Sequence, residues 1–509
     1  MKMRALCLML LILTLSFCSG CSKNPNEKAN ELYIEASQLL QDMKREARSY
    51  SIALESFSQA KEKIERIISK YKGTDLAVKL MSGQTRISGF ALSEIKEIEN
   101  FIKQLAEAEQ KPLSCALLIT KAIEDELQKS PALADIAVKY AEAGQFTQAL
   151  ETAKVIGYGI LKAPVLVDIA GKCAEAGQFT QALETAKVIR YGFLKAQALA
   201  DIADKYAEAG QKEKAAQLLT QALETAKVIE DESQKAHTLA DIAGKYAEAG
   251  QKEKAAQLFT QALETAKAIK DKDWKAKRLV DIAGKYAEAG QKEKAAQLLT
   301  QALETAKVIK SEYQKAKRLV DIAGKYAEAG QKEKAAQLLT QALETAKIIK
   351  DKDQKAQTLA DIADKYAEAG QKEKAAHLLT QALETAKVIK SEYQKAQTLA
   401  DIAGKYAETG QFTQALETTK AIKDKDQKAR ALADIAGKYA EAGQEEKAAQ
   451  QFTQALETAK AIESEYQKAR ALADIAKKYA EAGQQPSKQC IAILRDIVQA
   501  EVPMRSLWK

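Results

Sequence analysis

The sequence is poor in residues that most enzymes rely on. Its 509 residues include only two histidines, so acid–base catalysis and metal binding have few side chains to use. Proline is also scarce, at six residues, which favours long, uninterrupted helices. These shortages predict a helical protein with little metal or acid–base chemistry.

Motifs for phosphate, nucleophile and zinc chemistry are missing as well. The sequence contains no GxxxxGK[ST], GxGxxG, GxSxG or HExxH pattern. Carboxylates are abundant, but their pattern places them on solvent-facing helix surfaces. We therefore expect no enzyme, no cofactor, no metal site and no small-molecule substrate.

The charge balance excludes another class of partner. Lysine and arginine number 78 and aspartate and glutamate 70, an excess of +8 that falls to +6 once Lys2 and Arg4 are removed by processing. This excess is too small to indicate a nucleic-acid partner. With 46% hydrophobic residues, the chain has enough apolar surface to fold.

The N-terminus has the pattern of a secretory signal. Lys2 and Arg4 precede an apolar run over residues 5–17. Such a run, about thirteen residues long, is too short for a membrane span, which needs roughly twenty. The pattern therefore predicts a cleaved signal and not a membrane helix.

Small residues then lead into Cys21, and a polar stretch follows. Residues 1–20 resemble a bacterial lipoprotein signal peptide, which implies cleavage after Gly20 and lipidation of Cys21. Such signals usually have an aliphatic residue where Cys18 stands, so ordinary secretion with a free Cys21 thiol stays an alternative. The resemblance implies a lipid anchor in the bacterial cell envelope, and Ser22 implies the outer membrane, facing the periplasm.

A repeat dominates the rest of the chain. The tripeptide Asp-Ile-Ala occurs ten times, at three intervals of 33 residues and six of 40. Periods of this length indicate a solenoid. The copies begin at Asp135, Asp168, Asp201, Asp241, Asp281, Asp321, Asp361, Asp401, Asp434 and Asp474.

Each unit is predicted to be a pair of amphipathic helices. In residues 198–231, apolar residues recur with a period of 3.6 on both sides of Gly210, which suits the left-handed end of a helix. Ser311, Ser391 and Asp351, each followed three residues later by glutamine, are predicted to cap the next first helices.

The longer units contain seven extra residues in the second helix, 212–218 in the third copy. Seven residues make about two turns and rotate the apolar face by only about 20°, so this face is preserved. Asp201 and Lys205 stand four residues apart, and we interpret them as a solvated helix face. Cys173 and the repeated tyrosines, Tyr326 among them, are interpreted as core residues.

The spacing of small residues, one aromatic residue and a glycine within each unit resembles that of tetratricopeptide repeats (TPRs). The resemblance covers about residues 132–484 and implies an all-α fold, a right-handed α-solenoid of about ten helix-turn-helix units. The 40-residue period and the missing proline depart from the usual pattern and are similar to stretched variants in kinesin light chains and many bacterial proteins. The third copy carries this pattern at Ala203, Tyr206, Gly210, Ala215, Leu219, Ala222 and Leu223.

The expected domain organisation follows from these patterns. A polar tether, 21–30, joins the lipidated cysteine to an N-terminal helical segment, 31–130, which resembles divergent TPR units of outer-membrane lipoproteins. The repeat solenoid occupies 131–484, and a C-terminal capping helix with a tail occupies 485–509.

One position varies while the core positions repeat. In TPR proteins this position, in the first helix, faces the concave groove. Basic residues there predict patches for an acidic peptide or carboxylate, since arginine binds carboxylates bidentately; the alternative is solubilising charge. His237, which stands where other repeats have glutamine, is also consistent with an incidental surface histidine, as is His377. The candidate partner-binding residues are His237, Lys277, Arg278, Lys317, Arg318, Arg430 and Arg470.

Two functions are consistent with the sequence. The first is a lipid-anchored envelope scaffold that binds a protein or peptide through the solenoid, with the membrane contacted through Cys21. The alternative is a structural spacer, or a lipoprotein associated with an envelope polymer. The near-identity of the 40-residue units keeps the spacer open, because a specific groove normally diversifies.

Overall fold

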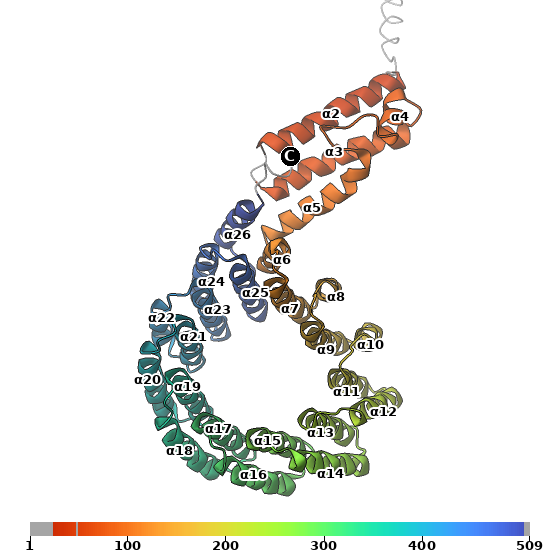
Figure 1. Cartoon of the computed structure of the whole chain (residues 1–509). Helices are drawn as coiled ribbons and strands as arrows, with labels where there is room; N and C mark the ends of the chain where they lie inside the picture. Colours follow the sequence, from red (N-terminus) through yellow and green to blue (C-terminus); the bar gives the residue numbers. More distant parts are fainter. Residues whose placement is uncertain (1–23, 47–48, 503–509) are drawn as a thin grey trace, which may run out of the picture. The chain divides into compact units, whose positions relative to one another are not determined.

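The computed structural model describes residues 24–46 and 49–502, and this part of the chain is helical throughout (Figure 1). The expected signal peptide, Cys21 and the tail residues 503–509 lie outside the described residues. Within the described ranges, no helix is long and apolar enough to cross a membrane. The helices form two compact units, one within Met1–Gln110 and Arg495–Lys509 and the other over Lys111–Leu494.

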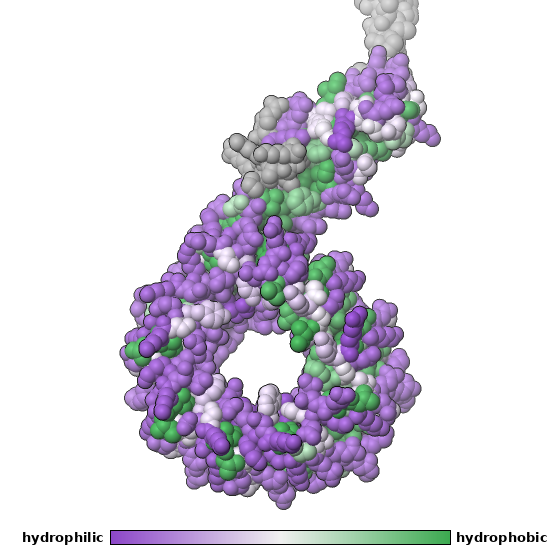
Figure 2. Space-filling model, viewed as in Figure 1, coloured by the Kyte–Doolittle hydropathy of each residue, from purple (hydrophilic) through white to green (hydrophobic). Residues whose placement is uncertain are grey.

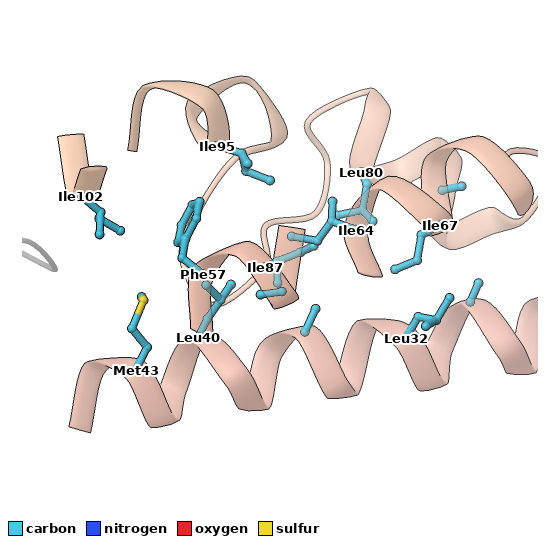
Figure 3. Packing of buried hydrophobic residues seen from close by; sticks show 14 of the residues in the cluster. Leu32, Leu40, Met43, Phe57, Ile64, Ile67, Leu80, Ile87, Ile95 and Ile102 are labelled. Atoms are coloured by element: carbon cyan, nitrogen blue, oxygen red, sulfur yellow. The ribbon is translucent and has the colours of Figure 1, made fainter. Parts of the chain in front are cut away.

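The first unit is a small helical bundle. Phe57, Ile64 and Ile67 on one face of its second helix are buried together with Leu40 and Ile102, so the apolar stripe seen in the sequence forms the core (Figure 3). The unit contains α2 (Pro25–Glu46), α3 (Tyr50–Lys70), α4 (Asp75–Met81), the 3-10 turn η1 (Leu92–Glu94) and α5 (Ile95–Ala108).

The expected tether is shorter than residues 21–30. Helix α2 already begins at Pro25, because proline suits the first turn of a helix, where its missing N–H has no partner to lose. Ala29 and Leu32 are buried in the core and hold this start in place. The sequence analysis predicted a tether because most residues of the segment are polar, although Ala29 and Leu32 belong to the core.

The second unit holds the repeats. Nine helical hairpins follow one another, flanked by an extra helix, α6 (Pro112–Ala122), and by α25 (Glu465–Glu481) and α26 (Lys488–Glu501). The hairpins are α7 (Glu126–Glu142) with α8 (Phe146–Lys154), α9 (Gly159–Glu175) with α10 (Phe179–Lys187), α11 (Gly192–Glu208) with α12 (Lys212–Lys227), α13 (Glu232–Glu248) with α14 (Lys252–Ala268), α15 (Lys272–Glu288) with α16 (Lys292–Lys307), α17 (Glu312–Glu328) with α18 (Lys332–Lys347), α19 (Lys352–Glu368) with α20 (Lys372–Lys387), α21 (Glu392–Glu408) with α22 (Phe412–Lys420), and α23 (Lys425–Glu441) with α24 (Glu445–Lys460).

The two period lengths have the predicted cause. Every first helix from α7 to α25 is 17 residues long, as α11 and α13 illustrate. The second helices are either short, with nine residues in α10, or long, with 16 in α12. The extra seven residues therefore lengthen the second helix by about 10 Å and leave the first helix unchanged.

The predicted helix ends are confirmed. Gly210 has φ +77°, and a Cβ there would meet nothing within 4 Å, so the backbone angle alone explains the glycine. Ser311 and Ser391 accept hydrogen bonds from the backbone N–H of Gln314 and Gln394 at 3.4 and 3.3 Å. Each turn therefore satisfies helix-end groups that would otherwise lack partners.

The repeated tyrosines belong to the core, as predicted. Tyr326 is fully buried, and its hydroxyl lies 3.3 Å from Oγ1 of Thr300 in the second helix of the preceding repeat. Tyr286 stacks on Phe259 of the preceding repeat, with ring centroids 4.2 Å apart. Each tyrosine thus joins two neighbouring repeats.

Helix α6 is a second helix without a first helix of its own. Measured back from the next Asp-Ile-Ala tripeptide, five buried residues in and just after α6 occupy the same positions as buried residues in and just after α12. Helix α6 contacts α25, which in turn has no second helix after it. The matching buried residues are Pro112, Leu113, Ala116, Thr120 and Ile123 in α6 and Leu218, Leu219, Ala222, Ala226 and Ile229 in and just after α12.

The two ends of the solenoid therefore complete one shared repeat. Helix α25 also contacts α7, so the first helices follow one another around a closed ring (Figure 1). Arg470 Nε lies 3.0 Å from Asp135 Oδ2, which repeats the contact of Arg430 with Asp474 between adjacent repeats. Figure 2 shows an open centre within this unit, surrounded largely by hydrophilic surface.

This closure changes two expected boundaries. The contacts of α6 place it with the repeats, whereas the sequence analysis assigned it to the segment 31–130. The end of the solenoid is covered by α6 and α7, and the expected cap, α26, contributes Cys490, which contacts Tyr479. The resemblance of α6 to a second helix lies in its buried positions and not in its residue types.

Candidate functional site

The inner face of the repeat ring is formed by the first helices. Figure 1 shows α7, α9 and the later odd-numbered helices on the inner side and their second helices outside. The Asp-Ile-Ala aspartates and the variable position four residues before them share this face, because four residues make about one helical turn. The inner face is thus where the repeats differ from one another.

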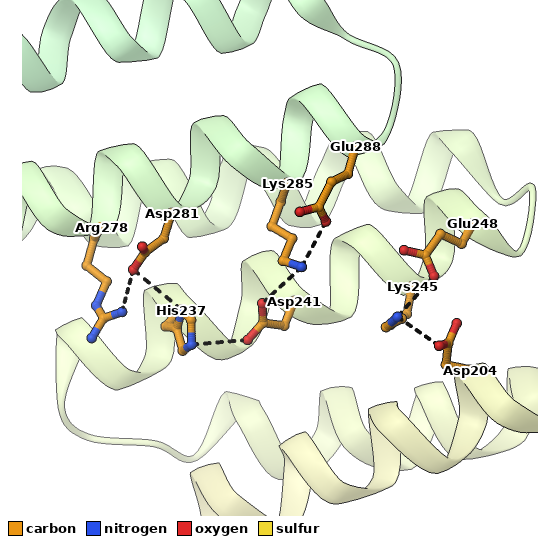
Figure 4. A network of polar contacts seen from close by, with 9 residues as sticks. All are labelled: Asp204, His237, Asp241, Lys245, Glu248, Arg278, Asp281, Lys285 and Glu288. Atoms are coloured by element: carbon orange, nitrogen blue, oxygen red, sulfur yellow. Dashed lines mark hydrogen bonds and ion pairs between the residues drawn. The ribbon is translucent and has the colours of Figure 1, made fainter. Parts of the chain in front are cut away.

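Charged residues on this face pair between repeats. Lys285 reaches Asp241 of the preceding repeat at 4.0 Å (Figure 4). Lys478 reaches Asp434 of its preceding repeat at 3.3 Å. Lys205, in contrast, lies 2.5 Å from Glu208. The interpretation as a solvated helix face is therefore wrong at Lys285 and Lys478, which bridge neighbouring first helices, whereas Lys205 pairs within its own helix.

These aspartates are less hydrated than the sequence suggested. The pKa of Asp201 is raised to about 6, mainly by burial and also by the carboxylates of Asp241 and Asp204, against the opposing effect of Lys245. Burial, followed by the carboxylate of Glu142, likewise raises the pKa of Asp168. The face therefore carries closely spaced carboxylates that resist ionisation.

Two of the candidate arginines lie inside the solenoid. Arg278 is 8% exposed and donates to Ser233 Oγ at 2.9 Å and to Asp281 at 2.7 Å. Arg318 is 6% exposed and contacts Asp273 at 2.9 Å and Asp321 at 2.8 Å. Both guanidinium groups therefore link neighbouring repeats, and the expected exposed pairs with Lys277 and Lys317 do not form.

The other candidate residues are distributed in different ways. Arg430 is 2.6 Å from Asp474, and Arg470 pairs with Asp135, so these arginines also join repeats. Lys317 is exposed and Lys277 half-buried, with its ammonium 5.2 Å from the ring centre of Trp274. Most of the expected basic patches are thus used in packing, which the sequence could not show because the partner carboxylates belong to adjacent repeats.

His237 lies in a hollow that sequence analysis did not identify. Its Nε2 is 3.3 Å from Asp241 and its Nδ1 is 3.8 Å from Asp281 (Figure 4). The hollow has a volume of about 840 Å³ and lies over α11, α13 and α15. Phe193 and Trp274 line it as well.

Three of the residues that line the hollow share one feature. Phe193, His237 and Trp274 are each the sole example of their residue type at the equivalent position of the repeats. Trp274, for instance, stands where other repeats carry glutamine, as at Gln234 and Gln314. The departure of Trp274 from this glutamine consensus is the signal that could have located the hollow from sequence.

The cysteines show no reactive arrangement. Cys115, Cys173 and Cys490 are buried free thiols, and Cys173 occupies a core position as predicted. Burial raises the pKa of Cys173 to about 11. In the described residues, no group of three or more histidine, cysteine, aspartate or glutamate side chains is arranged to hold a metal ion.

Comparison with known proteins yields structural neighbours only. No family model and no curated protein sequence matches the chain. Ton1535 from Thermococcus onnurineus NA1 is 18% identical, covering 66% of this chain and 96% of that chain, with a TM-score of 0.25. A kinesin light chain of Podosopora anserina with nearly identical TPR-like repeats is 24% identical, covering 38% and 95%, with a TM-score of 0.27.

A Rap protein complexed with competence and sporulation factor is a further neighbour. It is 15% identical and covers 65% of this chain and 97% of that chain, with a TM-score of 0.27. TM-scores this far below 0.5 carry no argument about function. The all-α repeat architecture follows from the helices of the chain itself.

Proposed function

We propose that the chain is a lipid-anchored scaffold of the bacterial cell envelope that binds a segment of another protein. Cys21 would carry the anchor, and the inner face of the repeat ring would carry the binding surface. The signal-like residues 1–20 support the anchor. The closed ring supports the binding role, because it holds side chains from several repeats in fixed register.

One observation carries this proposal. The repeats are nearly identical, yet Trp274 stands where seven other repeats have glutamine, and it lines one hollow with Phe193 and His237, the only phenylalanine and the only histidine at two variable positions. A purely structural spacer gives no reason for such changes to meet in space. A binding surface explains why these residues lie together, because recognition needs side chains that the rest of the array lacks.

The scaffold and the spacer give different results in an affinity experiment. The tagged full-length protein is extracted from membranes with detergent and used as bait. Its matched control carries the consensus residues Trp274→Gln and His237→Gln, which other repeats already accommodate. We expect one stoichiometric protein with the wild type and less of it with the control. Absence of any such partner would favour the spacer.

A further inference from the structure

The hollow over α11, α13 and α15 has the size and the aromatic surface of a binding site. Its volume of about 840 Å³ is within the usual range for ligand pockets. Trp274 is 47% exposed there, although tryptophan is usually well buried. Phe193, from α11, also lines the hollow and is half-buried. Exposed aromatic rings in a hollow offer contact area and can stack with cationic groups.

At the rim of the hollow, a negatively charged residue stands where most other repeats carry a positively charged one. Glu230 and Glu232 are exposed there. At the position of Glu230, five of the six following repeats, Lys423 included, carry lysine instead, so the hollow has a carboxylate where the array usually has an ammonium group. The other four lysines are Lys270, Lys310, Lys350 and Lys390.

The remaining charges of the hollow leave it acidic. Asp231 and Asp271 cap α13 and α15 by accepting backbone N–H groups at 2.7 and 2.9 Å. Arg278 is the one permanently cationic side chain among the lining residues, and Asp281 already offsets its charge. Five carboxylates line the hollow against this one arginine, so a bound segment would meet net negative charge. Its basic side chain would share the exposed indole ring with Lys277 and Arg278, which lie 5.2 and 5.6 Å from the ring centre.

The acidic surface continues beyond this hollow. A second hollow shares Gln197 with the first, whereas a third, over α19 to α25, has equal numbers of acidic and basic side chains. The excess is therefore local and not a property of the repeat. The second hollow is lined by Glu142, Asp168, Glu175, Asp201 and Asp204, against Lys172 and Lys205.

We infer that the hollow over α11, α13 and α15 binds an extended protein segment that carries arginine or lysine side chains, one of them against Trp274. This inference rests on the proposed scaffold function and names its ligand chemistry. It reverses the acidic ligand expected from the sequence, because Arg278 and Arg318 are committed to contacts between repeats. Charge complementarity and the exposed indole together favour a basic segment over a neutral one.

Binding of simple peptides tests the inference. Three fluorescent peptides of equal length, alternating alanine with arginine, glutamine or glutamate, are titrated with the full-length protein in detergent. We expect the arginine peptide to bind most tightly, with an affinity that falls as salt is added. Trp274→Gln should weaken its binding about three- to tenfold through the loss of the cation–π contact, and Trp274→Phe should retain much of it.

A matched pair of variants separates the hollow from general electrostatic attraction. Glu230→Lys and Glu463→Lys change the net charge equally and at equivalent positions, but Glu463 belongs to a distant repeat. Only Glu230→Lys should weaken binding of the arginine peptide, by about two- to fivefold, as expected for an exposed charge contact.

Equal effects of the two glutamate variants, or equal affinity for the three peptides, would overturn the inference. The scaffold function has its own test. A partner captured equally by wild type and by the Trp274→Gln, His237→Gln control would leave the scaffold in place and exclude this hollow. No captured partner would instead refute the scaffold, whatever the peptides do.

Discussion

Lys139, in the first helix of the first repeat, lies 3.3 Å from Asp474 in the last first helix, the same distance that separates Lys478 from Asp434 in adjacent repeats. Lys477 and Glu142 form a further contact at 3.0 Å across the seam, the interface at which α25 meets α6 and α7. The first repeat thus follows the last in the register used throughout the array. The contact is heterologous, and such contacts make a ring when the rotation closes.

The first prediction concerns the seam between α6 and α25. Ala116 is fully buried on α6, so Ala116→Arg should place an unpaired charge in the interface and cost about 3 kcal/mol or more. Hydrogen exchange should then rise in both α6 and α25, which are far apart in sequence, and stay unchanged in α16 and α17. Gln128→Arg, at an exposed position, is the control. Faster exchange in α6 alone would contradict the shared repeat.

The second prediction concerns the core between repeats. Tyr326 is fully buried, so Tyr326→Ala should reduce the free energy of unfolding by about 3 to 5 kcal/mol. Tyr326→Phe loses the hydroxyl contact with Thr300 and should cost about 1 kcal/mol. Because each repeat contacts its neighbours, hydrogen exchange should increase mainly over residues 310–350. No difference between the two variants would exclude the tyrosine ring as a core element.

The third prediction concerns an arginine first interpreted as a ligand contact. Arg318 is buried between Asp273 and Asp321, so Arg318→Ala should cost about 3 kcal/mol by leaving Asp273 without this partner. Arg318→Thr should cost less, because Thr398 donates from the equivalent position to Asp353. Thermal unfolding of the two variants, with Lys317→Glu as an exposed control, checks the order. A larger loss in Lys317→Glu would show that this arginine does not join the repeats.

The seam and the arginines show what the sequence could and could not predict. The hairpins, their two lengths, the Gly210 turn and the buried tyrosines follow from periods and propensities within one repeat. The pairing of Arg470 with Asp135 joins residues 335 positions apart, and no local pattern specifies which helix covers the last one. The hollow was missed for a related reason, since three neighbouring repeats contribute to it.

The fourth prediction concerns pH. Asp426 is 4% exposed, and burial raises its pKa to about 6 even though Arg430 and Arg470 oppose the rise. The equivalent Asp273 forms an ion pair with Arg318 of the next repeat. In the repeat that follows Asp426, the position equivalent to Arg318 is occupied by Ala471, which cannot form such a pair. Because the folded state holds this proton more tightly than the unfolded state, ionisation of Asp426 lowers stability as pH rises from about 4 to about 6.

Replacing the carboxylate removes this dependence. Asp426→Asn should gain up to about 2 kcal/mol relative to wild type between pH 4.5 and 7.5. Denaturant unfolding at the two pH values measures the difference, and Asp424→Asn, at a helix cap, provides a comparison at a carboxylate that already has a backbone partner. A constant difference between Asp426→Asn and wild type would show that the buried carboxylate does not titrate in this range.

The last prediction concerns location. If Cys21 carries the acyl chains, Cys21→Ser should release the protein from the membrane fraction, because each buried CH₂ contributes about 0.8 kcal/mol to anchoring. Cys490→Ser, at a buried thiol, should leave the protein in the membrane fraction. Flotation of the two variants with membranes makes the comparison, and a Cys21→Ser protein that still floats would rule out the lipid anchor.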